Sequence, residues 1–186
     1  AADTLTIGTT THGGAALFAE AVTVPTINIT GANSGDENST VTFNKAVTSS
    51  SGITLDDNTG VTKVIFAANN SVDITGTIDG ASAGEGIIQV TGATKTFKSA
   101  IGSTSVGTLN IDSTPVFEST VEATTIDIAG SVTATFNDVI TATTIALNGS
   151  STLTISYTGA ITVAGNITDT STSNEINVLF ATADTA

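Results

Sequence analysis

Residues 124–130 read Thr-Thr-Ile-Asp-Ile-Ala-Gly, and residues 143–149 repeat the pattern nineteen positions later as Thr-Thr-Ile-Ala-Leu-Asn-Gly. An aromatic unit precedes each copy, beginning at Phe117 in the first case and at Phe136 in the second. A fixed period of about 20 residues is the signature of a repeat architecture, in which each unit packs mainly on its neighbours. We therefore interpret the chain as a stack of similar units.

Aromatic residues mark the units along the whole chain. Neighbouring aromatic residues are separated by 19 to 31 positions. The aromatic residues are Phe18, Phe43, Phe66, Phe97, Phe117, Phe136, Tyr157 and Phe180. This spacing predicts one internal ladder of rings, made by Phe18, Phe43, Phe97, Phe117, Phe136 and Tyr157, whereas Phe66 begins a more divergent unit. We expect the longer separations to reflect larger loops at residues 33–38 and 79–86.

Within a unit, apolar residues and threonines alternate, as in Val132-Thr133-Ala134-Thr135-Phe136. A period of two, with many Val, Ile and Thr residues, indicates short strands with one buried face. The sequence therefore predicts an all-β fold, a parallel β-helix (β-solenoid) of about eight coils with an internal Phe ladder. A β-sandwich is the alternative, since regularly spaced short strands also fit that architecture. We expect one elongated domain over residues 1–186, as part or mature form of a larger exported protein.

Composition excludes several classes of function. The chain has 17 acidic residues against 4 lysines, a net charge of −13, and no cysteine. Such a surface repels phosphate backbones, so we expect no nucleic-acid partner. Without cysteine there is neither a disulfide framework nor a thiolate metal site. No stretch approaches the roughly 20 apolar residues that span a bilayer, so we expect no membrane insertion by this chain.

Units such as residues 134–149, Ala-Thr-Phe-Asn-Asp-Val-Ile-Thr-Ala-Thr-Thr-Ile-Ala-Leu-Asn-Gly, resemble repeats of bacterial surface proteins. They look like the passenger domains of rickettsial-type autotransporters and like repeats of some alphaproteobacterial surface-layer proteins. The resemblance implies a β-helical protein at the bacterial cell surface or outside the cell, with adhesion or layer assembly as its activity. It carries no catalytic residue onto this chain.

The residues for enzymatic chemistry are sparse. Polysaccharide lyases and hydrolases on β-helices use clustered carboxylates beside Arg, Lys or His, but this chain has no Arg and one His, His12 in an N-terminal turn. It contains no nucleophile elbow, phosphate-binding loop, zinc motif or dinucleotide-binding motif. We therefore predict that the protein is not an enzyme.

Two acidic turns are candidates for Ca²⁺, because paired carboxylates in Gly/Asn loops supply the oxygen ligands that Ca²⁺ takes. The candidate ligands are Asp36, Glu37, Asp56 and Asp57. Neither turn matches a complete calcium motif, so a solvated acidic turn stays the alternative. We expect no other cofactor.

Threonine pairs precede several aromatic residues, and side-chain alternation turns them outward when the ring points inward. The pairs are Thr40/Thr42, Thr94/Thr96 and Thr133/Thr135. Stacked coils would align them in a column, as in ice-binding solenoids. Lys63 and Ile65 before Phe66, and Val116 before Phe117, interrupt that array. The sequence therefore favours an ordinary solvated face.

Two functions follow from these observations. The first is a self-assembling surface-layer or filament building block, a homopolymer whose repulsion Ca²⁺ would neutralise. The alternative is an adhesin passenger segment that presents loops 31–40 and 79–86 to a host or neighbouring-cell surface.

Overall fold

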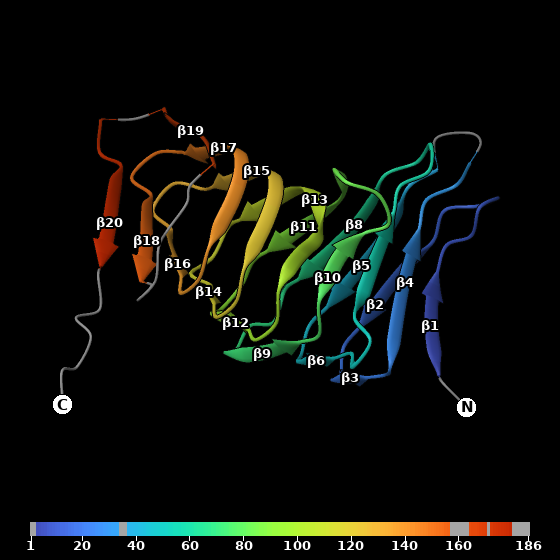
Figure 1. The fold of residues 1–186 in the computed structure, drawn as a ribbon. Coiled ribbons are helices and arrows are strands. Elements are labelled where there is room, and N and C mark those ends of the chain that lie inside the picture. Colours follow the sequence, from blue (N-terminus) through green and yellow to red (C-terminus); the bar gives the residue numbers. More distant parts are fainter. Residues whose placement is uncertain (1–2, 34–36, 157–163, 171, 180–186) are drawn as a thin grey trace, which may run out of the picture.

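The computed structural model describes residues 3–33, 37–156, 164–170 and 172–179 as a rod of stacked strands (Figure 1). All the registered strand pairs in this part of the chain are parallel, as in the pairing of Thr26–Thr30 with Ile53–Asp56 and of Thr133–Phe136 with Thr152–Ser156. The prediction of a parallel β-solenoid is therefore confirmed, and the β-sandwich alternative is wrong. The described strands make about seven turns, close to the eight coils expected. Among these residues no helix is long and apolar enough to cross a membrane.

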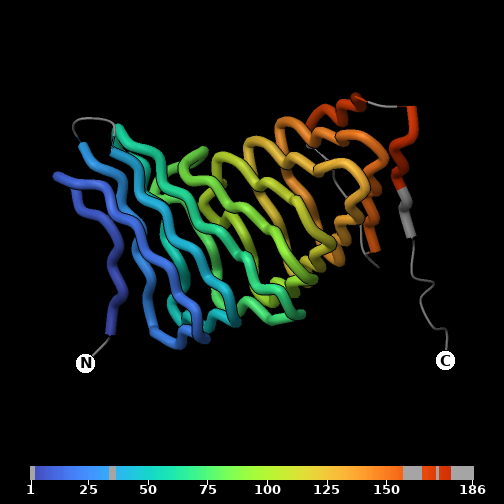
Figure 2. The backbone as a smooth tube through the Cα atoms, turned by 180° about the vertical axis from the view of Figure 1, so that it is seen from behind, coloured from blue at the N-terminus to red at the C-terminus, as the bar shows by residue number. Residues whose placement is uncertain are grey.

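Each coil contributes strands to three faces, and in Figure 2 the coils follow one another from the N-terminus to the C-terminus. The first face contains β1 (Thr4–Ile7), β4 (Thr26–Thr30), β7 (Ile53–Asp56) and β10 (Ile78–Gly80). The second contains β2 (Ala15–Phe18), β5 (Ser39–Phe43), β8 (Thr62–Phe66), β11 (Glu85–Val90) and β19 (Ala164–Asp169). The third contains β3 (Val22–Thr23), β6 (Val47–Thr48), β9 (Val72–Thr75), β12 (Lys95–Phe97), β14 (Val116–Phe117), β16 (Thr133–Phe136), β18 (Thr152–Ser156) and β20 (Glu175–Leu179).

The first two faces merge along the rod. In the early coils a corner separates them, but β13 (Ile101–Ile111), β15 (Val121–Ile128) and β17 (Ile140–Leu147) each run through both faces as one strand. The coil consequently shortens from 26 residues between Ile27 and Ile53 to 19 between Val121 and Ile140. The expected large loop at 79–86 is wrong, because β10 ends at Gly80 and β11 begins at Glu85. Part of the other expected loop, 34–36, lies outside the described residues.

The Phe ladder is confirmed, but it changes face halfway along the rod. Rings at the ends of β2, β5 and β8 stack on the second face, and rings at the ends of β12, β14 and β16 stack on the third. Phe66 belongs to the first stack and meets Phe97 edge to face, with ring centroids 5.4 Å apart. The 31-residue gap arises because Val90 takes the place in register with Phe66, and Phe97 follows on the next face. Tyr157 and Phe180 lie outside the described residues.

The core between the three faces is thin, and it is filled by inward columns of Ile, Val, Leu and Phe. The rings of Phe97 and Phe117 stack at 4.9 Å and those of Phe117 and Phe136 at 4.6 Å, nearly parallel in both pairs. This separation equals the spacing of neighbouring strands, about 4.8 Å, so ring stacking and strand pairing reinforce one another. Each coil depends on its neighbours for burial.

Phe117→Ala tests this arrangement. Phe117 is fully buried between two rings, so we expect its loss to lower the free energy of unfolding by about 3–5 kcal/mol. The measurement is urea denaturation followed by circular dichroism. Leu17→Ala is the control, because Leu17 is 67% exposed and its removal should change stability by less than about 0.5 kcal/mol. Equal losses in the two variants would contradict the ladder.

Candidate functional site

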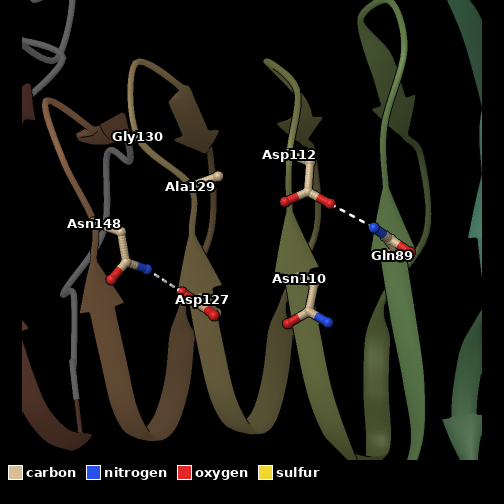
Figure 3. A pocket seen from close by; sticks show the side chains of 7 residues that line it. All are labelled: Gln89, Asn110, Asp112, Asp127, Ala129, Gly130 and Asn148. Atoms are coloured by element: carbon tan, nitrogen blue, oxygen red, sulfur yellow. Dashed lines mark hydrogen bonds between the residues drawn. The ribbon is translucent and has the colours of Figure 1, made fainter.

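An open groove on the second face gathers polar side chains from four successive coils. It lies over β11, β13, β15 and β17, and its lining residues are Gln89, Asn110, Asp112, Asp127, Ala129, Gly130 and Asn148 (Figure 3). Strand register brings them together, although they are spread over sixty residues of the sequence. We call this site the polar groove.

Strand alternation explains why these side chains point outward. Gln89, Asn110 and Asp127 occupy one register column between inward-facing apolar residues. A second column lies just beyond the strands, where the backbone N–H of Asp112 donates to Val90 and that of Asn148 donates to Ile128. The backbone hydrogen bonds therefore continue one residue beyond the strands, and they fix the positions of both columns.

Two hydrogen bonds orient the carboxylates of the groove. Gln89 Nε2 donates to Asp112 Oδ2 at 2.6 Å, and Asn148 Nδ2 donates to Asp127 Oδ1. The two bonds run in opposite directions along the rod, so each carboxylate is drawn away from the other (Figure 3). Asn110 lies on the strand that leads to Asp112 and beside Asp127, and Ala129 lies just beyond the strand of Asp127, so the four residues surround the space between the two strands (Figure 3). The lining offers hydrogen-bond donors and acceptors, but no His, Lys or hydroxyl group to act as base or nucleophile.

The carboxylate of Asp57, one of the predicted calcium ligands, organises its own turn. Its Oδ1 accepts from the backbone N–H of Thr62 at 2.7 Å and from the Thr62 hydroxyl at 2.5 Å. Its Oδ2 accepts from Gly86 N–H at 2.9 Å, which ties the turn to the next coil. Gly86 has φ of +79°, and a Cβ there would lie 2.5 Å from Leu55, so only glycine fits this contact.

The structure brings the two predicted calcium turns into neighbouring corners. Gly60 N–H donates to Ala32 O at 3.0 Å, which joins the corner of Asp56 and Asp57 to that of Glu37. Glu37 Oε2 accepts from Gly13 N–H at 2.9 Å, and Asp36 lies outside the described residues. Within the described ranges no three His, Cys, Asp or Glu side chains gather as metal ligands. Calcium binding by these residues stays a prediction.

Lys95 is a buried cation that the sequence interpretation missed. It is fully buried, and its Nζ donates to the carbonyl oxygens of Ala68 at 2.8 Å, Thr91 at 2.7 Å and Ala93. Burial lowers the pKa of Lys95 to about 8. Its position was readable, because Lys95 alternates with Thr94 and Thr96 and shares the inward side with Phe97.

The third face carries an array of threonines that includes one valine, Val116, and we call it the threonine face. Strand register aligns four rungs, namely Thr94/Thr96, Thr114/Val116, Thr133/Thr135 and Thr152/Thr154. Lys63 and Ile65 do not interrupt it, because β8 lies on the second face with Thr40 and Thr42. The interruption expected at Lys63 and Ile65 was wrong because it counted the pairs of both faces as one column, whereas Val116 does stand among the threonines as expected.

The buried lysine makes stability depend on pH. The folded chain releases the Lys95 proton near pH 8 and the unfolded chain near 10.5, so unfolding takes up a proton between these values. The free energy of unfolding of the wild type should therefore rise relative to that of Lys95→Met as the pH increases from 8 to 10. The rise should be up to about 1.4 kcal/mol per pH unit. Urea denaturation at several pH values measures it. Lys45→Met, on an exposed turn, controls for the lost charge. If the free energies of unfolding of the wild type and Lys95→Met differ by the same amount at every pH, the pKa of Lys95 is not lowered by burial.

Asp57→Asn separates the structural role of this carboxylate from a role as calcium ligand. It weakens charge-assisted hydrogen bonds to Thr62 and Gly86, so we expect a loss of about 2 kcal/mol in the free energy of unfolding. The loss should be equal with added Ca²⁺ and with chelator, and larger than that of Asp56→Asn, which removes the same charge one residue earlier. Stabilisation of the wild type by Ca²⁺ that vanishes in Asp57→Asn would instead make Asp57 a ligand.

Comparison with known proteins adds no assignment. No protein-family model, curated protein or solved structure matches this chain significantly. The fold by itself does not determine a function, so the function has to be argued from the surfaces described above.

Proposed function

We propose that this chain is a non-enzymatic building block of a bacterial surface layer or extracellular filament, and that copies associate side by side through the threonine face. One observation carries the proposal: eight outward positions on four adjacent coils hold seven threonines and one valine, with no charge, in a chain of net charge −13. The extracellular, cell-surface location is part of the proposal and is supported by the resemblance of residues 134–149 to surface-protein repeats.

Charge favours contact at this face. Two copies of a chain with this net charge repel one another, and the cost of approach is lowest where the surface carries no carboxylate. Asp73 borders the array at one end and Glu175 at the other, since they pair with Thr96 and Thr152 respectively. The exposed Lys98–Glu118 ion pair borders the array along one side, two residues after Thr96 and Val116. The uncharged area is therefore limited to the four rungs.

Regular packing of the core beneath the threonine face keeps the spacing of its rungs uniform. The rings of Phe97, Phe117 and Phe136 stack directly behind three of the rungs, with interplanar angles of 17° and 16°. The rungs also recur at nearly equal intervals of 20, 19 and 19 residues. A uniform surface of β-branched methyl groups and hydroxyls can pack against a copy of itself.

The two ends of the described rod differ. The strands β1, β2 and β3 are each last in their sheet, so one edge of each offers unpaired backbone groups to a further coil or a second copy. At the other end the exposed Asp169 stands in register with the buried Leu147, at the end of the edge strand β19. A charge on an edge strand discourages further pairing. The ends therefore support head-to-tail growth less well than the threonine face supports lateral contact.

A matched pair of variants tests the proposal. Thr135→Glu adds a carboxylate to the threonine face, and Thr125→Glu adds one to an equally half-buried outward position on the second face. Like charges brought together at an interface cost several kcal/mol, so Thr135→Glu should weaken self-association by more than tenfold while Thr125→Glu stays close to wild type. Sedimentation velocity and negative-stain electron microscopy measure association, with Ca²⁺ and then with chelator.

Three outcomes would count against parts of this proposal. Isolated rods of the wild type at high concentration, with and without Ca²⁺, would contradict self-association. Equal weakening by Thr135→Glu and Thr125→Glu would contradict the threonine face as the contact. Assembly unchanged by chelator would remove calcium as the neutralising ion.

An adhesin segment is the second candidate, and the polar groove is the observation that favours it. The structure weakens loop 79–86 as the recognition surface, since only residues 81–84 connect two strands there. The polar groove instead offers convergent carboxylates and carboxamides on a rigid sheet.

A further inference from the structure

We infer that the polar groove binds a neutral polyhydroxylated chain, a glycan, which lies across the strands from β11 to β17. The inference rests on the adhesin candidate and deepens it, whereas the threonine face belongs to a different face of the rod. Its basis is the placement of Asp112, Asn110 and Asp127 around an open space.

The geometry is wrong for a shared metal ion. Asp127 is in register with Asn110, so it lies one strand across and two residues back from Asp112. With strands about 4.8 Å apart and residues about 3.3 Å apart, the two Cα atoms are separated by about 8 Å. Gln89 and Asn148 draw the carboxylates further apart, whereas Ca²⁺ needs its oxygen ligands within about 2.6 Å of one point.

The same geometry suits a row of hydroxyl groups. A hydroxyl both donates and accepts hydrogen bonds, a carboxylate only accepts, and a carboxamide does both. Asp112 and Asp127 each use one oxygen on a carboxamide, which leaves the other oxygen to face the groove. Asn110, in register with Asp127, supplies a donor and an acceptor, and the methyl group of Ala129 supplies an apolar contact for ring C–H groups.

Charge selects a neutral ligand. Two carboxylates line the groove, no lysine does, and the chain carries −13 overall, so uronic-acid or sulfated chains are repelled. The lining has no aromatic ring to stack on a sugar, so each sugar unit contributes little. The groove spans three strand intervals, about 14 Å, so affinity should increase with the number of sugar units until the ligand fills it.

The test uses NMR titration of the ¹⁵N-labelled chain with neutral hexose oligosaccharides of increasing length and with oligogalacturonate. We expect shifts of the side-chain amides of Gln89, Asn110 and Asn148 on addition of a neutral oligosaccharide, tighter binding with length, and no binding of the acidic oligomer. Asn110→Ala should weaken binding at least tenfold. Asn28→Ala, an outward asparagine of β4 on the first face, should leave it unchanged.

Several results would overturn the inference. These are no shift with any neutral oligosaccharide, equal binding by Asn110→Ala and wild type, or amide shifts in the groove caused by Ca²⁺ alone. Thr135→Glu keeps the groove intact, so its oligosaccharide binding should match that of the wild type. If the wild type binds the oligosaccharide but does not self-associate, only the assembly proposal is overturned. If the wild type self-associates but binds no oligosaccharide, only the glycan site is overturned.

Discussion

Parallel pairing of each coil with the next is the constraint on which the rest of this structure depends. Because paired strands stay in register, every side chain is repeated in a column along the rod, inward or outward according to its place in the strand. Columns of Ile, Val and Phe make the core, and columns of Thr, Asn and Asp make the surfaces. The described residues form strands and no helices, around a core that is narrow. Because a narrow core needs few large rings and outward strand positions suit threonine, the chain has a low aromatic and a high threonine content.

The same constraint limits where function can reside. Polar groups turned away from solvent find partners within the narrow coil, as the buried Lys95 does in three carbonyl oxygens and the half-buried Asp57 in Thr62 and Gly86. Both groups hold neighbouring segments of backbone together, and calcium binding by Asp57 stays a prediction. The surfaces open to partners are the outward columns, and two of them differ in character. The threonine face is uncharged and regular, whereas the polar groove is concave and rich in carboxylate and carboxamide groups.

Much of the fold could be predicted from the sequence, because the 19-residue period and the alternation around Phe136 are local signals. The change of face by the Phe ladder could not, since spacing alone does not distinguish a longer loop from a step to the next strand. The extent of the threonine face could not be predicted for the same reason, because the rung of Thr114 and Val116 is placed only by the contacts of β14 with β12 and β16. The polar groove was missed because Gln89, Asp112 and Asn148 belong to different coils. Lys95 was readable from its alternation with Phe97, although lysines are rarely buried.

The register of the third face tests this account most directly, since both the ladder and the threonine face depend on it. Nuclear Overhauser contacts in the ¹³C,¹⁵N-labelled chain measure it. The account predicts backbone contacts from Thr96 to Val116, from Val116 to Thr135 and from Thr135 to Thr154, together with contacts from Phe66 to Val90. Contacts that pair Phe66 with Phe97 as in-register strand neighbours would place all the rings on one face and contradict it.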